Sequence, residues 1–141
     1  DLEGRQHRLS ELRGKVVLLD VWGSWCPGCV EELPRLQKAY ETYRGRGLEI
    51  LSLDYGDKPE EFRKFVAEKG LPWMHATAQS VEDVVRHNLR IWTFPTKILL
   101  DREGRIVSVG DPGQPQLGEE HLLKTLEEVF SGSYASPTSS R

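Results

Sequence analysis

The stretch from residue 15 to residue 43 constrains the fold of this chain most strongly, because its apolar pattern changes period once. Residues 15–22, KVVLLDVW, are rich in β-branched side chains and almost continuously apolar, which is typical of a strand covered on both faces in a parallel sheet. From residue 26 to residue 43 the apolar side chains recur at three- and four-residue steps, which predicts an amphipathic helix. The only two cysteines, Cys26 and Cys29, stand where the strand gives way to the helix.

Further elements follow this strand and helix. The patterns predict a second strand over residues 48–55, a helix over 57–70 that Asp57 can cap, a short helix over 80–88, an antiparallel hairpin of strands 96–101 and 105–110, and a last helix over 117–130. Residues 71–79 are predicted to be irregular. This order predicts an α/β sandwich with a mixed sheet. With no internal repeat, we expect one domain over residues 1–131 and a flexible tail over 132–141, whose residues are small and polar.

The charge pattern argues against several classes of partner. The chain has 19 Lys and Arg against 22 Asp and Glu, a formal net charge of −3, with both signs mixed along its length. No basic stripe indicates nucleic acid as a partner. No apolar run approaches the roughly 18 residues that a membrane helix needs, so we expect no membrane segment in this chain. We expect a monomer.

Two of the three interpretations of the cysteine pair are structural. A zinc site usually needs four ligands, but only two thiols are present and the four histidines show no ligand-pair spacing; we therefore expect no metal. A structural disulfide across so short a loop stabilises the fold by only about 2 kcal/mol, against about 4.7 kcal/mol for a 100-residue loop. The structural disulfide remains an alternative, although a disulfide that closes a longer loop would stabilise the fold more.

The third interpretation is a dithiol that opens and closes. If Cys26 begins the helix, unpaired backbone N–H groups and the helix dipole favour its thiolate, the nucleophilic form. Cys29 lies one turn later and can close the ring. Pro27 falls where helices tolerate proline, and Gly28 leaves space for a substrate. Trp25 is expected at the mouth of the site, with core packing as the alternative.

The segment LLDVWGSWCPGCVEELP resembles the active-site segment of the thioredoxin superfamily, and more narrowly that of the TlpA/ResA-like thiol–disulfide oxidoreductases. The narrower likeness includes C-x-x-E-x-P, here Cys29, Glu32 and Pro34, and TFPTKILLDREGRIV, which is similar to the family's proline-bearing segment and hairpin. It covers about residues 1–130. The resemblance implies a thioredoxin-like fold: a mixed central sheet flanked by helices, with an N-terminal extension and a helical insert before a cis-proline segment. Pro34 is expected to kink the first helix.

The resemblance also assigns roles to four residues around the dithiol. Asp20 matches the buried aspartate of thioredoxins, which implies a carboxyl beneath Cys29 with a raised pKa that exchanges protons; the alternative is a solvated strand end. Glu32 is implied to tune the dithiol, with a solvated surface acid as the alternative. Pro95 is implied to be cis and to pack against the disulfide. Phe94 then offers backbone hydrogen bonds to an extended partner, while its bulk either restricts the partners or fills the core.

A few other polar and aromatic residues in or near the predicted strands carry simpler expectations. Trp22 and Trp92 are expected to pack in the core. Lys15 and Lys97 are expected to be ordinary surface charges.

By this resemblance the chain is a thiol–disulfide oxidoreductase of protein disulfides, acting as a reductant and recharged by an upstream redox partner. It needs no cofactor other than the Cys26–Cys29 disulfide. The family likeness implies an extracytoplasmic location and substrates such as apocytochrome c. Two alternatives remain: a peroxiredoxin-like peroxidase, whose T-x-x-C pattern lacks its threonine because Gly23 stands there, and a non-enzymatic binding module with a structural disulfide.

Overall fold

A five-stranded sheet forms the centre of the structure, a computed structural model that describes residues 1–77, 79–114, 117–118 and 121–134. Its strands are β1 (Val16–Trp22), β2 (Leu48–Asp54), β3 (Met74–Ala76), β4 (Thr96–Leu100) and β5 (Ile106–Gly110). They lie in the order β3-β2-β1-β4-β5. Strands β1, β2 and β3 run parallel, while β4 is antiparallel to both β1 and β5. The predicted mixed sheet and its hairpin are confirmed.

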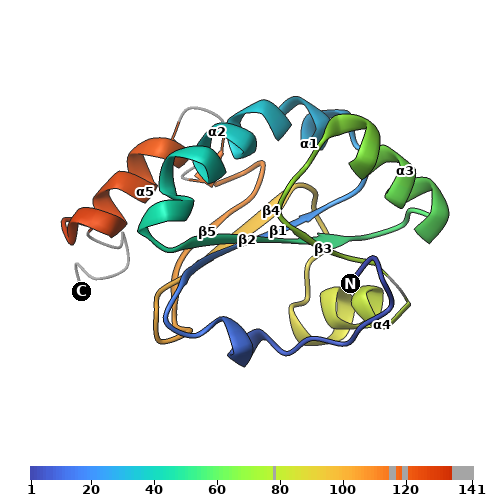
Figure 1. Ribbon diagram of the computed structural model, residues 1–141, viewed down its shortest axis with the longest axis horizontal. Coiled ribbons are helices and arrows are strands. Elements are labelled where there is room, and N and C mark those ends of the chain that lie inside the picture. Colours follow the sequence, from blue (N-terminus) through green and yellow to red (C-terminus); the bar gives the residue numbers. More distant parts are fainter. Residues whose placement is uncertain (78, 115–116, 119–120, 135–141) are drawn as a thin grey trace.

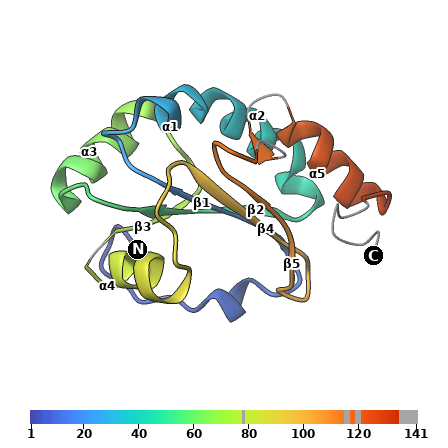
Figure 2. The ribbon, with the colours of Figure 1, turned by 180° about the vertical axis from the view of Figure 1, so that it is seen from behind.

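Helices cover both faces of this sheet (Figure 1). On one face lie α1 (Pro27–Glu31), α2 (Leu33–Tyr43) with its 3-10 turn η2 (Arg44–Arg46), α3 (Pro59–Lys69) and α5 (Leu122–Ser131). The other face is covered by the N-terminal segment, including the 3-10 turn η1 (Leu9–Leu12), and by α4 (Gln79–Asp83) with its π-helical continuation η3 (Val84–Asn88). Figure 2 shows the same division from behind. The predicted N-terminal extension and helical insert therefore close the second face of the sheet.

Strand β1 is buried along its whole length, which explains its continuous apolar sequence. Successive side chains of a strand point to opposite faces. Leu18 and Trp22 belong to the core beneath α1, α2, α3 and α5, whereas Val17, Leu19 and Val21 belong to the core on the α4 side. By the same alternation, Asp20 points toward the layer that contains α1.

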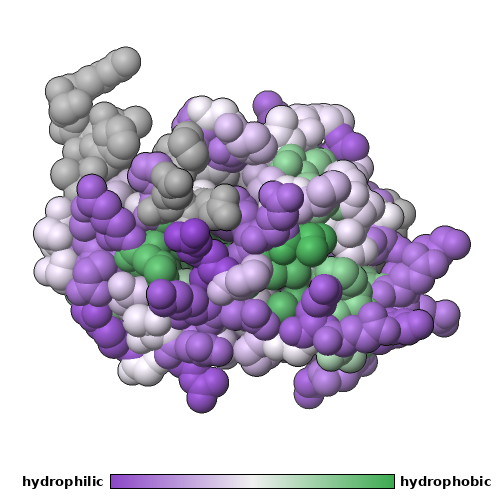
Figure 3. Space-filling model, turned by 90° about the horizontal axis from the view of Figure 1, so that it is seen from above, coloured by the Kyte–Doolittle hydropathy of each residue, from purple (hydrophilic) through white to green (hydrophobic). Residues whose placement is uncertain are grey.

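The helix predicted over residues 26–43, which Pro34 was expected to kink, is instead divided into α1 and α2. Pro27 occupies the first turn of α1 and Pro34 the first turn of α2, with Glu32 between the two helices. A proline has no N–H to donate and its ring crowds the preceding turn, so the first helix cannot continue through Pro34. On the outer surface of this helical layer hydrophilic residues predominate, and hydrophobic ones gather in a few patches (Figure 3).

Three expectations about the middle and end of the chain need comment. The segment predicted to be irregular contains β3, a three-residue strand parallel to β2 that is too short to show a period of its own. The predicted helix over residues 80–88 is α4 followed by the π turn η3. Of the predicted tail, residues 135–141 lie outside the described part of the chain, so the boundary after residue 131 stays a prediction.

Candidate active site

The two cysteines form a disulfide at the start of α1. Cys26 is the N-cap residue, with φ −98° and ψ 107°, and its Sγ accepts a hydrogen bond from the Cys29 N–H at 3.3 Å. Cys26 keeps 7% of its surface exposed and Cys29 only 2%. Pro27 and Gly28 are exposed on the outer side of the same turn. The pair therefore has an outer and an inner sulfur, as expected for a dithiol that exchanges with a partner.

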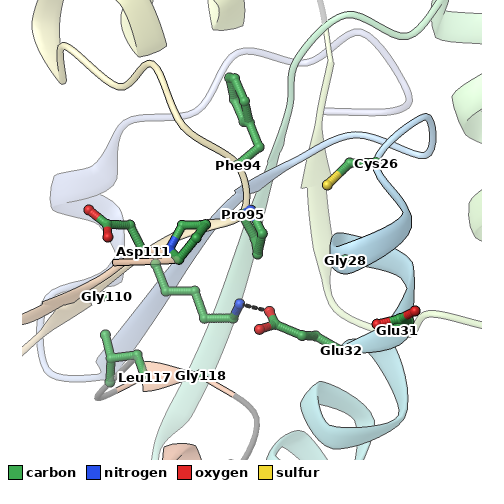
Figure 4. Close-up of a pocket in the computed structure, with 12 residues that line it drawn as sticks. Cys26, Gly28, Glu31, Glu32, Phe94, Pro95, Gly110, Asp111, Leu117 and Gly118 are labelled. Atoms are coloured by element: carbon green, nitrogen blue, oxygen red, sulfur yellow. Dashed lines mark hydrogen bonds and ion pairs between the residues drawn. The ribbon is translucent and has the colours of Figure 1, made fainter. Parts of the chain in front are cut away.

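A groove of about 390 Å³ borders Cys26 (Figure 4). The residues that line it come from α1 and the residues on either side of it, from β4 and the segment before it, and from the end of β5 and the segment after it: Cys26, Gly28, Glu31, Glu32, Phe94, Pro95, Lys97, Gly110, Asp111, Pro112, Leu117 and Gly118. The Phe94–Pro95 peptide bond is cis, as predicted. The Cys26 side chain points toward Phe94 and Pro95 across the groove.

Aromatic rings form the rim of the site on the side of β2. Trp25 is 51% exposed. Its Nε1 donates to the Tyr55 carbonyl at 2.6 Å, and its ring packs edge-on against Phe94 with centroids 5.5 Å apart. Phe94 in turn stacks on Tyr55 at 5.1 Å. Gly23 makes room for this indole, since a Cβ there would stand 2.1 Å from Trp25 Nε1. Trp25 therefore stands at the mouth of the site and Phe94 is half-buried under it.

Asp57, which the sequence predicted to be a helix cap, instead holds the loop before Cys26. Asp57 was expected to cap α3, but the N-cap position is Lys58. The Asp57 carboxylate instead accepts two hydrogen bonds from Ser24, from its N–H at 2.8 Å and its Oγ at 2.6 Å. These bonds tie the loop that carries Trp25 to the end of β2, so the position of the indole depends on contacts between two distant segments.

Beneath α1 lies a group of three charges, of which Asp20 and Lys97 are buried and Glu32 is half-buried. Asp20 is 2% exposed and Lys97 is 3% exposed. The Lys97 Nζ forms an ion pair with Glu32, drawn as a dashed line in Figure 4, and lies 3.7 Å from Asp20 Oδ1. The expectation that Lys97 is a surface charge is wrong: its side chain points from β4 into the helical layer. Glu32 is not freely solvated either, because it is paired there.

The environment of Asp20 favours its protonated form. Burial raises the pKa of Asp20 to about 6, because removing a carboxylate from water is costly. Lys97 works against this rise and the negative charge of Glu32 adds to it. Near neutral pH, Asp20 can therefore both accept and release a proton.

A second buried carboxyl lies at the end of β2, and sequence reasoning missed it. Asp54 is 2% exposed, and its Oδ2 accepts a hydrogen bond from Thr77 Oγ1 at 2.8 Å. Burial and the neighbouring carboxyl of Asp57 raise the pKa of Asp54 to about 8. The strand predicted over residues 48–55 contains Asp54 near its end, but only the fold buries its carboxyl and brings Thr77 against it.

The two tryptophans expected in the core behave differently. Trp22 is fully buried, as expected. Trp92 is 67% exposed, so its prediction is wrong. The Arg86 guanidinium lies 4.0 Å from the centre of the Trp92 ring and 4.7 Å from that of Tyr55. The attraction between this cation and the two rings stabilises Trp92 in its exposed position.

Neither a metal centre nor a membrane helix is found in the described residues. Within residues 1–77, 79–114, 117–118 and 121–134, no three His, Cys, Asp or Glu side chains are grouped so that they could hold a metal ion. In the same part of the chain, every helix is too short or too polar to cross a membrane.

Comparison with known proteins identifies relatives of this site and fold. The model of the AhpC/TSA family matches residues 1–109. Thiol-disulfide oxidoreductase ResA of Geobacillus thermodenitrificans is 35% identical over 109 residues, which are 77% of this chain and 62% of that protein. The ResA protein of Bacillus anthracis is 32% identical over 126 residues, 88% of this chain and 71% of that protein. This chain thus spans between about three fifths and seven tenths of the length of these relatives.

Solved structures show the same fold. The crystal structure of the thioredoxin domain of a thiol-disulfide oxidoreductase from Bacteroides vulgatus matches with a TM-score of 0.79 and 30% identity, covering 92% of this chain and 89% of that one. The solution structure of a thiol:disulfide interchange protein from Bacteroides sp. matches with a TM-score of 0.81 and 28% identity, covering 99% and 88%. The predicted thioredoxin-like fold is confirmed.

Proposed function

Because this chain belongs to the AhpC/TSA family of thioredoxin-like proteins, we propose that it is a thiol–disulfide oxidoreductase that exchanges the Cys26–Cys29 disulfide with protein partners. One observation carries the proposal: the outer sulfur, Cys26, caps α1 at the edge of an open groove, while the inner sulfur, Cys29, is enclosed behind it. A purely structural disulfide needs neither the groove nor this difference in exposure.

The backbone around Cys26 supports its role as nucleophile. The N–H of Cys29 points at Cys26 Sγ, and this donor is one of those that a helix start leaves unpaired. A hydrogen-bond donor and the positive end of the helix dipole both favour thiolate over thiol. After reduction of the disulfide, Cys26 is therefore the sulfur expected to ionise first and to attack.

The exchange then proceeds in two steps. The Cys26 thiolate attacks one sulfur of the partner's disulfide; that S–S bond breaks, a mixed disulfide forms, and the other partner sulfur leaves as a thiolate. Cys29 loses its proton and attacks Cys26 Sγ, so the mixed disulfide breaks and the second partner sulfur leaves. One electron pair passes from the dithiol to the partner, and the Cys26–Cys29 disulfide is restored.

Asp20 supports the assignment of the protein as a reductant. The second step needs a base for the Cys29 proton, and Cys29 belongs to the same buried layer into which Asp20 points. Because the pKa of Asp20 is raised to about 6, its carboxylate is a stronger base than an ordinary aspartate and is still largely ionised at pH 7. Glu32 lies at the end of the same charged group that faces the groove, and its negative charge helps to raise the pKa of Asp20.

The groove supports binding of an extended segment of the partner. We infer that the backbone of Phe94, directly before the cis-proline, pairs with such a segment, and that the exposed ring of Trp25 offers it an apolar surface. Pro27 and Gly28 leave the outer side of the helix turn open. An upstream redox partner must return the disulfide to the dithiol after each cycle, and we place this cycle outside the cytoplasm, by likeness to the TlpA/ResA group.

Single replacements of the two cysteines test the proposal. With dithiothreitol as electron donor, the wild type should reduce a disulfide-bonded test protein. Cys26→Ser should abolish this activity, and Cys29→Ser should accumulate a covalent mixed disulfide visible by mass spectrometry. Full activity in both variants refutes the mechanism.

The reduction potential separates the proposal from the two alternatives. A value for Cys26–Cys29 between about −270 and −120 mV supports exchange, whereas a value below about −300 mV indicates a structural disulfide. Peroxide consumption that exceeds the rate of disulfide reduction would indicate a peroxidase instead. The same oxidised and reduced samples serve all three measurements.

A further inference from the structure

Two acidic side chains at the end of β2 have no role in the exchange steps described so far. We propose that Asp54 and Asp57 form a carboxyl pair that shares one proton, and that this pair positions the loop of Ser24 and Trp25 at the mouth of the site. Loss of the shared proton releases the indole from the rim. The inference rests on the proposed function only where it concerns partner binding, since the loop contacts can be measured in the protein alone.

The loop that leads into the reactive cysteine is bonded to the segment that follows β2. The Asp57 carboxylate accepts from the Ser24 N–H at 2.8 Å and from the Ser24 Oγ at 2.6 Å. Trp25 Nε1 donates to the Tyr55 carbonyl at 2.6 Å. Gly56, with φ 91°, lies against the indole, because a Cβ there would stand 3.0 Å from Trp25 Nε1. The position of the rim therefore depends on where this short segment is held.

Asp54 lies beneath this segment and needs a proton there. Its Oδ2 accepts from Thr77 Oγ1 at 2.8 Å, while no donor among the described residues reaches its buried Oδ1. Two ionised carboxylates offer each other only acceptors, whereas one shared proton gives a short, charge-assisted hydrogen bond. Burial and Asp57 together raise the pKa of Asp54 to about 8. Because the bonds from Ser24 favour an ionised Asp57, the proton of the pair stays on Asp54 at neutral pH.

The elements around Asp54 contribute further groups. Helix α4 contributes Glu82, whose negative charge also raises the pKa of Asp54. Strand β1 places the buried, uncharged ring of Trp22 at the register position of Asp54. Strand β3 contributes His75, which is uncharged above pH 6 because burial lowers its pKa to about 4. Other charged side chains of this region are exposed at the start of α3 or bonded to the Tyr55 hydroxyl: Lys58, Glu60 and Glu61 in the first case and Arg86 in the second. The two acidic neighbours both favour the proton, so the pair loses it only in alkaline solution.

Loss of the proton acts on the rim through Asp57. Once both carboxyls are ionised they repel each other, and the buried Asp54 has no route to water. Asp57 is half-buried and can move outward, which breaks its two bonds to Ser24 and draws the Tyr55 carbonyl away from Trp25. The sulfur of Cys26 gains no charge and loses no bond in this change. The pair therefore affects how a partner is held at the rim, and so KM rather than kcat.

Three replacements should act on the pair in different ways. Asp54→Asn puts a neutral amide that still donates in place of the protonated carboxyl, so the indole should stay on the rim at every pH. Asp57→Ala removes both acceptors of Ser24, so the indole should be released at every pH. Thr77→Val removes a bond that lowers the pKa of Asp54, so the pH of release should rise. Glu41→Gln removes an exposed acid of α2 and is the matched control.

The measurement follows the Trp25 indole N–H by ¹H–¹⁵N NMR from pH 5.5 to 10 in the oxidised protein, where the disulfide leaves no thiol to titrate. The resonance is identified by its loss in Trp25→Phe. A transition near pH 8 in the wild type and in Glu41→Gln, but not in Asp54→Asn, supports the proposal. No transition in the wild type, or the same transition in Asp54→Asn, overturns it. If Asp57→Ala does not fold, the direction of the shift in Thr77→Val decides.

A second readout connects the carboxyl pair to partner binding. With a disulfide-bonded test protein as substrate, KM of the wild type should rise at least about threefold more than that of Asp54→Asn between pH 7 and pH 9. An equal rise in both proteins overturns the effect on binding. A wild type that reduces no protein contradicts the proposed function instead, and leaves the NMR result on the carboxyl pair as it stands.

Discussion

The position of the Trp25 indole depends on the absence of a side chain at Gly23. Replacing Gly23 therefore tests how the aromatic rim of the groove is held in place. Gly23→Ala adds a Cβ that would stand 2.1 Å from Trp25 Nε1. The backbone of Gly23 is outside the left-handed region, so alanine brings no strain of its own there. Because Trp25 is at the surface, we expect the indole to swing out rather than the loop to unfold.

The cost of this movement can be estimated from the contacts that the indole gives up. The hydrogen bond from Trp25 Nε1 to the Tyr55 carbonyl contributes about 1 kcal/mol net, since both groups can reach water once it breaks. The edge-on contact with Phe94 contributes about another 1 kcal/mol. We therefore expect Gly23→Ala to lower the free energy of unfolding by about 2 kcal/mol. With a slope of about 2 kcal/mol per molar urea, the midpoint should fall by roughly 1 M.

A double-mutant cycle in urea tests the cause. If the cost comes from Trp25, then Gly23→Ala should change the stability of a Trp25→Ala protein by less than about 0.5 kcal/mol. Gly45→Ala is the control, because a Cβ there meets nothing within 4 Å and its φ is not positive; its midpoint should not fall and should rise by up to about 0.5 M, since alanine lowers the entropy of the unfolded chain. An equal loss with and without Trp25 would refute the steric argument.

Three further outcomes follow from the buried groups. The pKa of Asp54 is raised to about 8, so its proton stabilises the fold fully below about pH 4 and this stabilisation is lost, by up to about 1.4 kcal/mol per pH unit, as the pH rises toward 8; Asp54→Asn should flatten that loss in urea titrations, and an unchanged pH profile contradicts the assignment. Reducing the Cys26–Cys29 disulfide should lower the free energy of unfolding by no more than about 2 kcal/mol, since the closed loop is short; a much larger drop would point to a structural staple. Phe62→Ala should cost about 3–5 kcal/mol by calorimetry, because this fully buried ring packs edge-on against Trp22; a loss below about 1 kcal/mol would show that the site collapses around the gap.

The sequence was most informative where a local pattern and a local geometry coincide. The change from a continuous apolar run to a helical period fixed β1 and the helices that follow. Cys26, Pro27 and Cys29 fall within one turn, so their relation needed no tertiary information. Pro34 interrupts the helix because it has no N–H to donate and its ring crowds the preceding turn, which can be read from this residue alone. Strand β3 gave no such pattern, because three residues on a sheet edge are too few to show alternation.

The errors concern residues whose surroundings are set by distant segments. Lys97 sits in an apolar run, which argued for a strand but not for the face it would use. Its burial follows from the register with β1, and register is decided by the packing of both faces rather than by either strand alone. Trp92 is exposed, and its ring contacts the guanidinium of Arg86 from the π turn, a contact that the local sequence does not reveal. Asp57 had a capping position available but bonds Ser24 instead, across a gap of 33 residues.

The buried charges of Asp20 and Lys97 also bear on the function of the protein. Replacing a buried ion pair by apolar side chains of similar size is often neutral or stabilising, because desolvation offsets the attraction between the charges. Stability alone therefore gives no reason for Asp20 and Lys97 to occupy facing positions in two apolar strands. The proposed exchange gives one, because it requires Cys29 to lose and regain a proton within a dry layer. The low polarity that makes Asp20 expensive to ionise also gives its carboxylate the affinity for a proton that this proposed step requires.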